Sequence, residues 1–183
     1  MMNTTQLNTF SNKWYKPASK LKIALWYVVN QVCFNNSFAV LNFVKAPLLR
    51  AFGAQVGVGV IIKPAVNIKY PWLLSIGDYC WIGENVWIDN LAQVTLHNNV
   101  CVSQGALLLC GNHNYKKTTF DLIVQPITLH DGVWIGAKSV VTGGVVAHSH
   151  ALLTVASVAS TKLDAYGIYR GNPAVKIKDR VIS

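Results

Sequence analysis

The stretch "IGDYCWIGENVWIDNLAQ", residues 76–93, carries an aliphatic residue at every sixth position, at Ile76, Ile82 and Ile88. The same spacing continues on both sides of it. The matching aliphatic residues elsewhere are Val56, Ile62, Ile68, Leu96, Val102, Leu108, Leu129, Ile135, Val141, Ala147, Leu153 and Ala159. An amphipathic helix would repeat about every 3.6 residues and a strand every 2, so neither explains a period of six. Short β segments joined by turns, three to a coil, do explain it, and we therefore predict a parallel β-helix.

The spacing of the predicted coils locates the irregularities of this β-helix. Grouped in threes, the repeats predict five coils, which begin at Val56, Ile76, Leu96, Leu129 and Ala147. A coil of three sextets needs 18 residues, whereas the coil starts lie 20, 20, 33 and 18 residues apart. Every surplus follows the third sextet, so we expect all insertions at one corner of the prism. They are two bulges, near residues 74–75 and 94–95, and one long protruding loop at about 114–128, whose length favours a functional role.

The composition favours one globular domain with an anionic ligand. Of the 183 residues, 52% are hydrophobic and 13% are charged, the net charge is +9, and Glu84 is the only glutamate. This balance favours nucleic acid, a phospholipid surface or a phosphorylated ligand. Because no dense run of Lys and Arg is interleaved with aromatic residues, we expect no nucleic acid partner. We expect a helical segment at residues 1–50, the β-helix domain at 51–178 and a tail at 179–183.

The N-terminal segment contains the apolar run "LKIALWYVVNQVCF", residues 21–34, preceded by Lys13, Lys16, Lys20 and Lys22. This run is too short to span a bilayer. We interpret it as a helix that packs on its own domain or on a neighbouring chain, or alternatively as one that makes a peripheral contact with the membrane. The four cysteines form no Cys-x-x-Cys pair, and we find no cleavable signal. We therefore expect reduced thiols in a cytoplasmic protein, with the inner face of the membrane as the alternative location.

Four motifs carry a resemblance to a known family. They are "KAPLLRAFGAQVG" (45–57), "GNHNY" (111–115), "VWIGAKSVV" (133–141) and "YRGNPAVKIK" (169–178). With the six-residue repeat, they resemble the left-handed β-helix acyltransferases, and within these the colanic-acid-type and maltose/galactoside-type sugar O-acetyltransferases. The resemblance implies an all-β fold, a left-handed parallel β-helix with an N-terminal helix. It also implies acetyl-CoA as the acyl donor, a saccharide acceptor in exopolysaccharide, capsule or lipopolysaccharide biosynthesis, and a homotrimer with its sites between chains.

His113 is the candidate catalytic residue, because it is the only one of the five histidines at the root of the long loop. An imidazole side chain, whose pKa in general is about 6.5, suits removal of a proton from an attacking hydroxyl. The resemblance places the family's catalytic histidine at the same position. It also suggests that Asp89 and Asn90 face the acceptor, or the thioester region, from the adjacent chain; the alternative is a pair that stabilises a turn. Asn112 and Asn114 flank the histidine and are candidates for binding the acceptor and for orienting the imidazole, although the family more often has Asp where Asn114 stands.

The resemblance also assigns a coenzyme site. It implies that Trp134, Gly136 and Ala137 line the pantetheine path, that Val155, Ser160 and Thr161 lie further along it, and that Lys178 meets the nucleotide phosphates. Small side chains at such positions would let the coenzyme approach the backbone. We expect the oxyanion of the tetrahedral intermediate to bind a backbone N–H near Gly136 or Ala137 of a neighbouring chain.

Two alternatives to acetyl transfer remain open. A non-catalytic scaffold trimer would keep the coils and lose the site. A γ-carbonic-anhydrase-like metalloenzyme would need a second histidine five residues from the first, but Thr118 stands five after His113. His97, His130 and His148 follow equivalent core positions and should form a column along one edge of the prism. We interpret this column as surface or interface residues, and we expect no metal.

Overall fold

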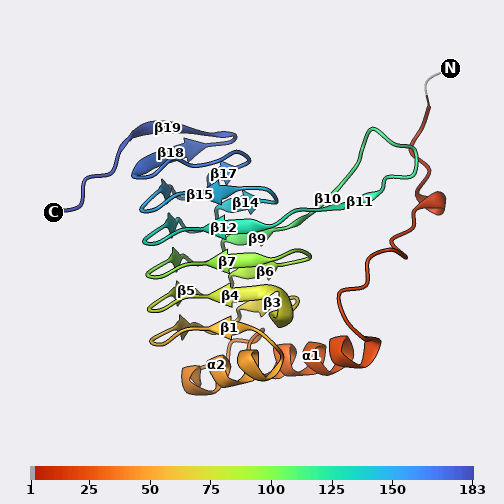
Figure 1. Ribbon diagram of the computed structural model, residues 1–183, viewed down its shortest axis with the longest axis horizontal. Coiled ribbons are helices and arrows are strands. Elements are labelled where there is room, and N and C mark those ends of the chain that lie inside the picture. The colour runs from red at the N-terminus through yellow and green to blue at the C-terminus, as the bar shows by residue number, and fades with distance from the viewer. Residues whose placement is uncertain (1–2) are drawn as a thin grey trace.

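Three parallel sheets enclose one core in the computed structural model, which describes residues 3–183 (Figure 1). Sheet A contains β1 (Gln55–Val56), β4 (Leu74–Ile76), β7 (Val94–Leu96), β12 (Ile127–Leu129) and β15 (Val146–Ala147). Sheet B contains β2 (Ile61–Ile62), β5 (Trp81–Ile82), β8 (Cys101–Val102), β13 (Trp134–Ile135), β16 (Leu152–Leu153), β18 (Gly167–Gly171) and β19 (Ala174–Asp179), the last antiparallel to β18. Sheet C contains β3 (Asn67–Ile68), β6 (Trp87–Asp89), β9 (Leu107–Leu109), β14 (Val140–Thr142) and β17 (Val158–Ala159). The chain passes from A to B to C in each coil, so the predicted parallel β-helix is confirmed.

The six-residue period marks the core. Of the aliphatic positions in the repeat, all but one are buried, with at most 3% of their surface exposed. The exception is Val56 in β1, which is partly exposed. Each buried aliphatic residue stacks on its equivalent in the next coil, as Ile62 does on Ile82 and Ile82 on Val102. The hydrophobic effect therefore acts on a continuous column of side chains rather than on separate repeats.

All insertions leave the solenoid at the corner between sheets C and A, as the coil spacing predicts. The first contains the short 3-10 helix η2 (Pro71–Leu73), and the second occupies residues 90–93. Both insertions lie a few residues before the bulges predicted at 74–75 and 94–95, so the predicted positions of the bulges were wrong. Residues 74–75 and 94–95 belong to β4 and β7, where Ser75 pairs with Gln55 and with Thr95, so the ladder keeps them in regular strands.

The third insertion is an antiparallel hairpin, which we call the arm. It is built from β10 (Gly111–His113) and β11 (Leu122–Val124), with Asn112 paired to Ile123. The loop predicted at about 114–128 therefore starts too late, because the arm already begins at Gly111. It also ends too late, because β12 begins at Ile127. Backbone pairing across the hairpin draws residues on both sides of the predicted loop into strands. The arm projects sideways from the stack (Figure 1).

Two helices, rather than the single one predicted, cover the open end of the first coil. They are α1 (Lys20–Cys33) and α2 (Asn42–Ala51), and α2 contains Pro47. Their side chains satisfy the carbonyls that no lower coil can pair. The indole of Trp26 donates to the Ile68 carbonyl at 2.8 Å, and the Lys45 ammonium donates to the carbonyls of Ile62 and Lys63 at 3.0 and 2.8 Å. Burial lowers the pKa of Lys45 to about 8.

The remaining sequence predictions concern the N-terminus and the cysteines. Ahead of α1, residues 3–19 form an extended strap with one short 3-10 turn, η1 (Leu7–Thr9), and the strap rises beside the arm (Figure 1). Among the helices of residues 3–183, none has the length and apolarity needed to cross a bilayer. All four cysteines are unpaired thiols, as the sequence predicts.

Candidate active site

His113 lies in β10, and its ring orientation is set by the returning strand of the arm. Nδ1 lies 2.9 Å from the backbone carbonyl oxygen of Phe120, and the imidazole stacks on the Phe120 ring with centroids 4.4 Å apart and planes 7° apart. A carbonyl oxygen only accepts, so Nδ1 carries the proton of the neutral imidazole. Nε2 is then left with a free lone pair and can act as a general base.

Phe120 is a residue that the sequence did not identify. It stands seven positions after His113 and meets it only because the hairpin folds back, with His113 paired to Leu122. Its φ of 50° places it in the left-handed region, which is uncommon for a bulky residue. Eight other non-glycine residues of the described chain, Tyr79 and Tyr166 among them, adopt the same region, so this conformation by itself does not distinguish Phe120.

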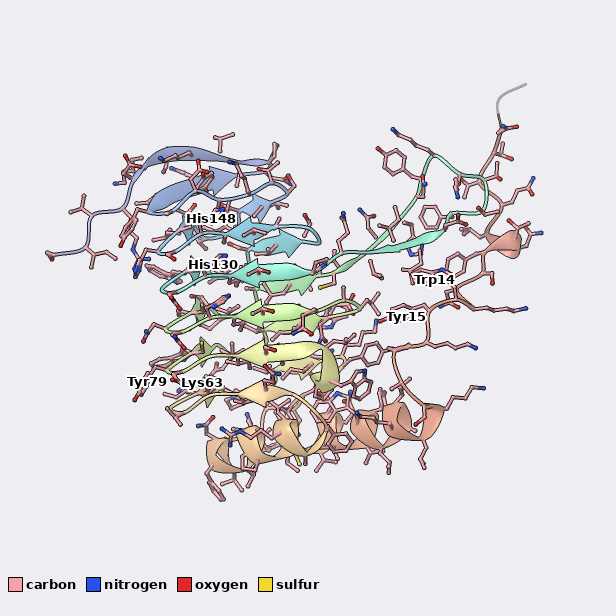
Figure 2. All side chains as sticks on the ribbon, viewed as in Figure 1. Trp14, Tyr15, Lys63, Tyr79, His130 and His148 are labelled. Carbon is pink, nitrogen blue, oxygen red and sulfur yellow. The ribbon has the colours of Figure 1, made fainter. Side chains whose placement is uncertain are left out.

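The strap supplies a second aromatic contact that the sequence did not reveal. The ring centroid of Phe10 lies 5.5 Å from that of His113, at a tilt of 59°. The backbone N–H of Gln6 donates to the Thr118 carbonyl at 2.8 Å, and the Tyr15 hydroxyl donates to the Leu91 carbonyl at 2.5 Å. The strap is therefore joined both to the arm and to the second insertion. Figure 2 shows Trp14 and Tyr15 on this segment, between α1 and the arm.

Asn112 and Asn114 do not orient the imidazole. The Asn112 side-chain oxygen accepts from the backbone N–H of His113 at 2.7 Å, and that of Asn114 accepts from the N–H of Lys116 at 3.1 Å. Both side chains therefore stabilise the local backbone. The orienting role that the sequence suggested for them is taken by the Phe120 carbonyl, so the replacement of the family's usual Asp by Asn114 leaves the imidazole contact intact.

Asp89 and Asn90 lie at the arm corner but differ in what they can reach. The Asp89 carboxylate is mostly buried and lies 2.9 Å from the Lys69 ammonium, and its backbone carbonyl accepts from Cys110 at the arm root at 3.2 Å. Asn90 is fully buried, and its amide bonds the backbone of Tyr70 and the Leu73 carbonyl. It holds the first insertion in place, so the acceptor-binding role predicted for Asn90 is not supported.

A hollow of about 370 Å³ lies at the corner between sheets B and C. It brings together four of the predicted coenzyme residues, Trp134, Gly136, Ala137 and Val155. Its other lining residues are Ser103, Gln104, Leu152, Leu153 and Thr154. A second hollow of about 420 Å³ adjoins it at Ser103 and Gln104, and we call the two together the groove. Two adjoining hollows suit a long chain-like ligand better than a compact one.

Backbone contacts refine the predicted coenzyme residues. The Gly136 N–H donates to the Leu153 carbonyl of the next coil at 2.7 Å, so it is not free to bind an oxyanion. A Cβ at Gly136 would lie 2.7 Å from that same carbonyl oxygen, which explains the glycine by coil stacking rather than by a ligand. Trp134 is half exposed, and its indole donates to the Ser103 hydroxyl at 2.9 Å.

Ser160, Thr161 and Lys178 lie outside this groove. Ser160 and Thr161 follow β17 and are exposed at the C-to-A corner, where the arm also leaves the solenoid. Lys178 is exposed on β19, opposite Ile168. Within one chain, the predicted coenzyme residues therefore lie in three places, at the B-to-C corner, at the C-to-A corner and, for Lys178, on sheet B. His113 does not share a corner with the groove.

The predicted histidine column is present at the corner between sheets A and B. The ring centroids of His97 and His130 are 4.7 Å apart and those of His130 and His148 are 5.5 Å apart, with nearly parallel planes. His130 and His148 lie one above the other in Figure 2. Burial and the two neighbouring imidazoles lower the pKa of His130. Across residues 3–183, no three His, Cys, Asp or Glu side chains are grouped in a way that could hold a metal ion.

Comparison with known proteins identifies relatives over nearly the full chain. The chain is 34% identical over 169 residues to a protein of Escherichia coli K12 named as a colanic acid biosynthesis acetyltransferase, WcaF. The matched region covers 92% of this chain and 93% of the relative. It is 24% identical to the galactoside O-acetyltransferase of the same organism, over 80% of this chain and 73% of the relative. No protein-family model matches the chain.

Solved structures agree on the fold. The hexapeptide-repeat acetyltransferase VCA0836 of Vibrio cholerae, in complex with acetyl coenzyme A, superposes with a TM-score of 0.78 at 20% identity, covering 91% of this chain and 93% of that one. A galactoside acetyltransferase in complex with coenzyme A gives a TM-score of 0.77 at 21% identity, covering 87% of this chain and 80% of that one.

Proposed function

The chain belongs to the family of the colanic acid biosynthesis acetyltransferase WcaF, and on this basis we propose that it is an acetyl-CoA-dependent O-acetyltransferase. It acetylates a hydroxyl group of a saccharide during the synthesis of a cell-surface polysaccharide. The observation that carries the proposal is the Nδ1 contact of His113 with the Phe120 carbonyl, because it leaves Nε2 as a base on a projecting arm.

The proposed reaction is a direct transfer. Nε2 of His113 accepts the proton of the saccharide hydroxyl while the oxygen attacks the thioester carbonyl. The tetrahedral intermediate collapses, the C–S bond breaks, and the imidazolium returns the proton to the coenzyme thiolate. Because the Gly136 N–H is already used, the N–H of Ala137 is the better candidate for stabilising the oxyanion. Asp89, beside the arm root, is the candidate for binding a second hydroxyl of the acceptor.

The groove that contains Trp134, Ala137 and Val155 binds the pantetheine arm. The two adjoining hollows support this assignment, as does the mixture of apolar lining and hydroxyl groups. The predicted roles of Ser160, Thr161 and Lys178 remain part of the proposal, with Ser160 and Thr161 supplied from the C-to-A corner and Lys178 from β19 of sheet B.

The proposed assembly is a homotrimer in which each site combines two chains. His113 is carried by the C-to-A corner and the groove by the B-to-C corner, so one chain alone does not bring them together. A neighbouring copy that places its arm against the groove solves this problem with one repeated, heterologous interface. The proposal also includes a cytoplasmic location with the N-terminal helix in contact with the inner face of the membrane.

Calorimetry with acetyl-CoA, followed by thiol release in the presence of saccharide acceptors, tests the proposed function. Ala137→Trp should abolish binding, because the indole would fill the hollow. Val58→Trp adds the same group at an exposed position away from the groove and should bind as the wild type does. A wild-type protein that does not bind acetyl-CoA would refute the proposal and favour the non-catalytic scaffold.

Subunit complementation tests the composite site. His113→Ala and Ala137→Trp are each expected to be inactive, but trimers assembled from an equal mixture contain sites with an intact arm and an intact groove. Random assembly should restore about a quarter of the sites. If each site were built within one chain, the mixture would stay inactive.

A further inference from the structure

The outward side of α1 is apolar, which is the reverse of the usual pattern. Its domain-facing side carries the buried residues Trp26 and Asn30. Its opposite side carries an exposed stripe, with exposed fractions of 69, 53, 61 and 66% for Leu21, Leu25, Val28 and Val32. A helix on the surface of a soluble domain normally turns its polar face to water. This helix therefore has two faces to bury, and the domain covers only one of them.

The apolar stripe continues across the same end of the solenoid. Phe38, Val40, Leu41 and Phe43, from the segment after α1 and the start of α2, are all more than half exposed, Phe38 by 92%. In α2, Lys45 is fully buried against the first coil. We call the combined surface of α1, α2 and their connection the apolar base. Figure 1 shows both helices lying together across this end. An exposed apolar surface of this kind marks a site of interaction.

The charge of this end of the chain is uniformly positive. Residues 1–77 hold eight of the sixteen Lys and Arg and none of the seven Asp and Glu, so they carry +8 of the net +9. Lys20 begins α1 and Lys16 stands four residues before it; both are exposed, and neither forms an ion pair with any residue in the part of the chain that the structure describes. Apolar side chains that are flanked by unpaired Lys residues, with no Asp or Glu nearby in the sequence, complement a surface that is both apolar and negatively charged.

We propose that the apolar base docks on a bilayer containing anionic lipid, with α1 lying in the interfacial plane. Leu21, Leu25, Val28 and Val32 would enter the acyl boundary, while Lys16 and Lys20 would meet the headgroups. A second copy of the chain, packed end to end, is disfavoured because both ends would present cations, and residues 20–51 contain no Asp or Glu to pair with them. The inference makes the proposed membrane contact specific, and it does not depend on the chemistry proposed for His113.

Co-sedimentation of the purified full chain with vesicles tests the proposal. We expect binding to vesicles of phosphatidylcholine with about one third phosphatidylglycerol, weaker binding to pure phosphatidylcholine, and loss of binding as salt rises from about 0.1 to 0.5 M. Leu25→Asp should lower the partition coefficient at least about tenfold, since it replaces an inserted side chain by a charge. Val181→Asp is the matched control, because Val181 is 90% exposed at the opposite terminus.

A second variant keeps the test independent of helix stability. Lys16→Glu with Lys20→Glu changes only exposed side chains and should reduce binding to the anionic vesicles alone. Equal binding of wild type and both variants would overturn the proposal. So would a wild type that ignores both vesicles and instead forms a larger assembly that Leu25→Asp dissociates in sedimentation velocity. Acetyl transfer to a soluble acceptor should be unchanged in Leu25→Asp, so failure of docking and failure of catalysis are distinguishable.

Discussion

Replacement of His113 by alanine is the most direct perturbation of the candidate site. It removes the only imidazole of the arm, while the Phe120 carbonyl and ring stay in place. General base catalysis contributes about 10²–10⁴-fold, so kcat should fall by that factor, equivalent to about 3–5 kcal/mol of transition-state stabilisation. The affinity for acetyl-CoA should change little, because the groove that binds it is lined by other residues.

The assay is thiol release from acetyl-CoA at saturating acceptor, with binding of acetyl-CoA measured separately. His97→Ala is the matched control, since it removes an imidazole that stacks on His130 at a different corner of the prism. The control should keep the wild-type kcat. If His113→Ala retained more than about a tenth of wild-type kcat, the role of His113 as general base would be refuted. Equal losses in His113→Ala and His97→Ala would point to a general effect on folding instead.

Three further predictions follow from particular contacts. Gly136→Ala should lower the free energy of unfolding in urea by about 1–3 kcal/mol, because its Cβ would overlap the backbone of the next coil; an unchanged midpoint would contradict the stacking role. Burial lowers the pKa of Lys45 from 10.5 to about 8, so the unfolded chain binds more protons between these values, and the wild type should gain stability relative to Lys45→Met as pH rises through about 8 to 10.5. Parallel pH profiles for the two proteins would count against this. Phe10→Ala removes the ring packed beside His113 and should speed amide hydrogen exchange in the arm while leaving the coils unaffected; unchanged exchange would show that the strap does not order the arm.

The sequence by itself determined the solenoid, because one aliphatic residue in six is a local pattern that reads directly as the core of a parallel β-helix. The surplus residues between coils also located the insertion corner, since a regular coil leaves no other place for them. His113 was identifiable in the same way, from its position at the longest surplus. The sequence did not resolve the ends of the insertions, because strand pairing across coils and within the arm decides which residues join the ladder.

Only the tertiary structure decided how His113 is held and where the coenzyme residues lie. The Phe120 carbonyl, the Phe10 ring and the burial of Asn90 all depend on contacts between segments distant in sequence, and no periodic pattern encodes them. The outward face of α1 is a similar case. A helical stripe of apolar residues predicts burial, but the fold had already buried the opposite side with Trp26 and Asn30. The physical reason is the same in each case. The repeat specifies how the coils stack on one another, whereas the positions of the arm, the strap and the helices depend on the surfaces that the stacked coils leave exposed.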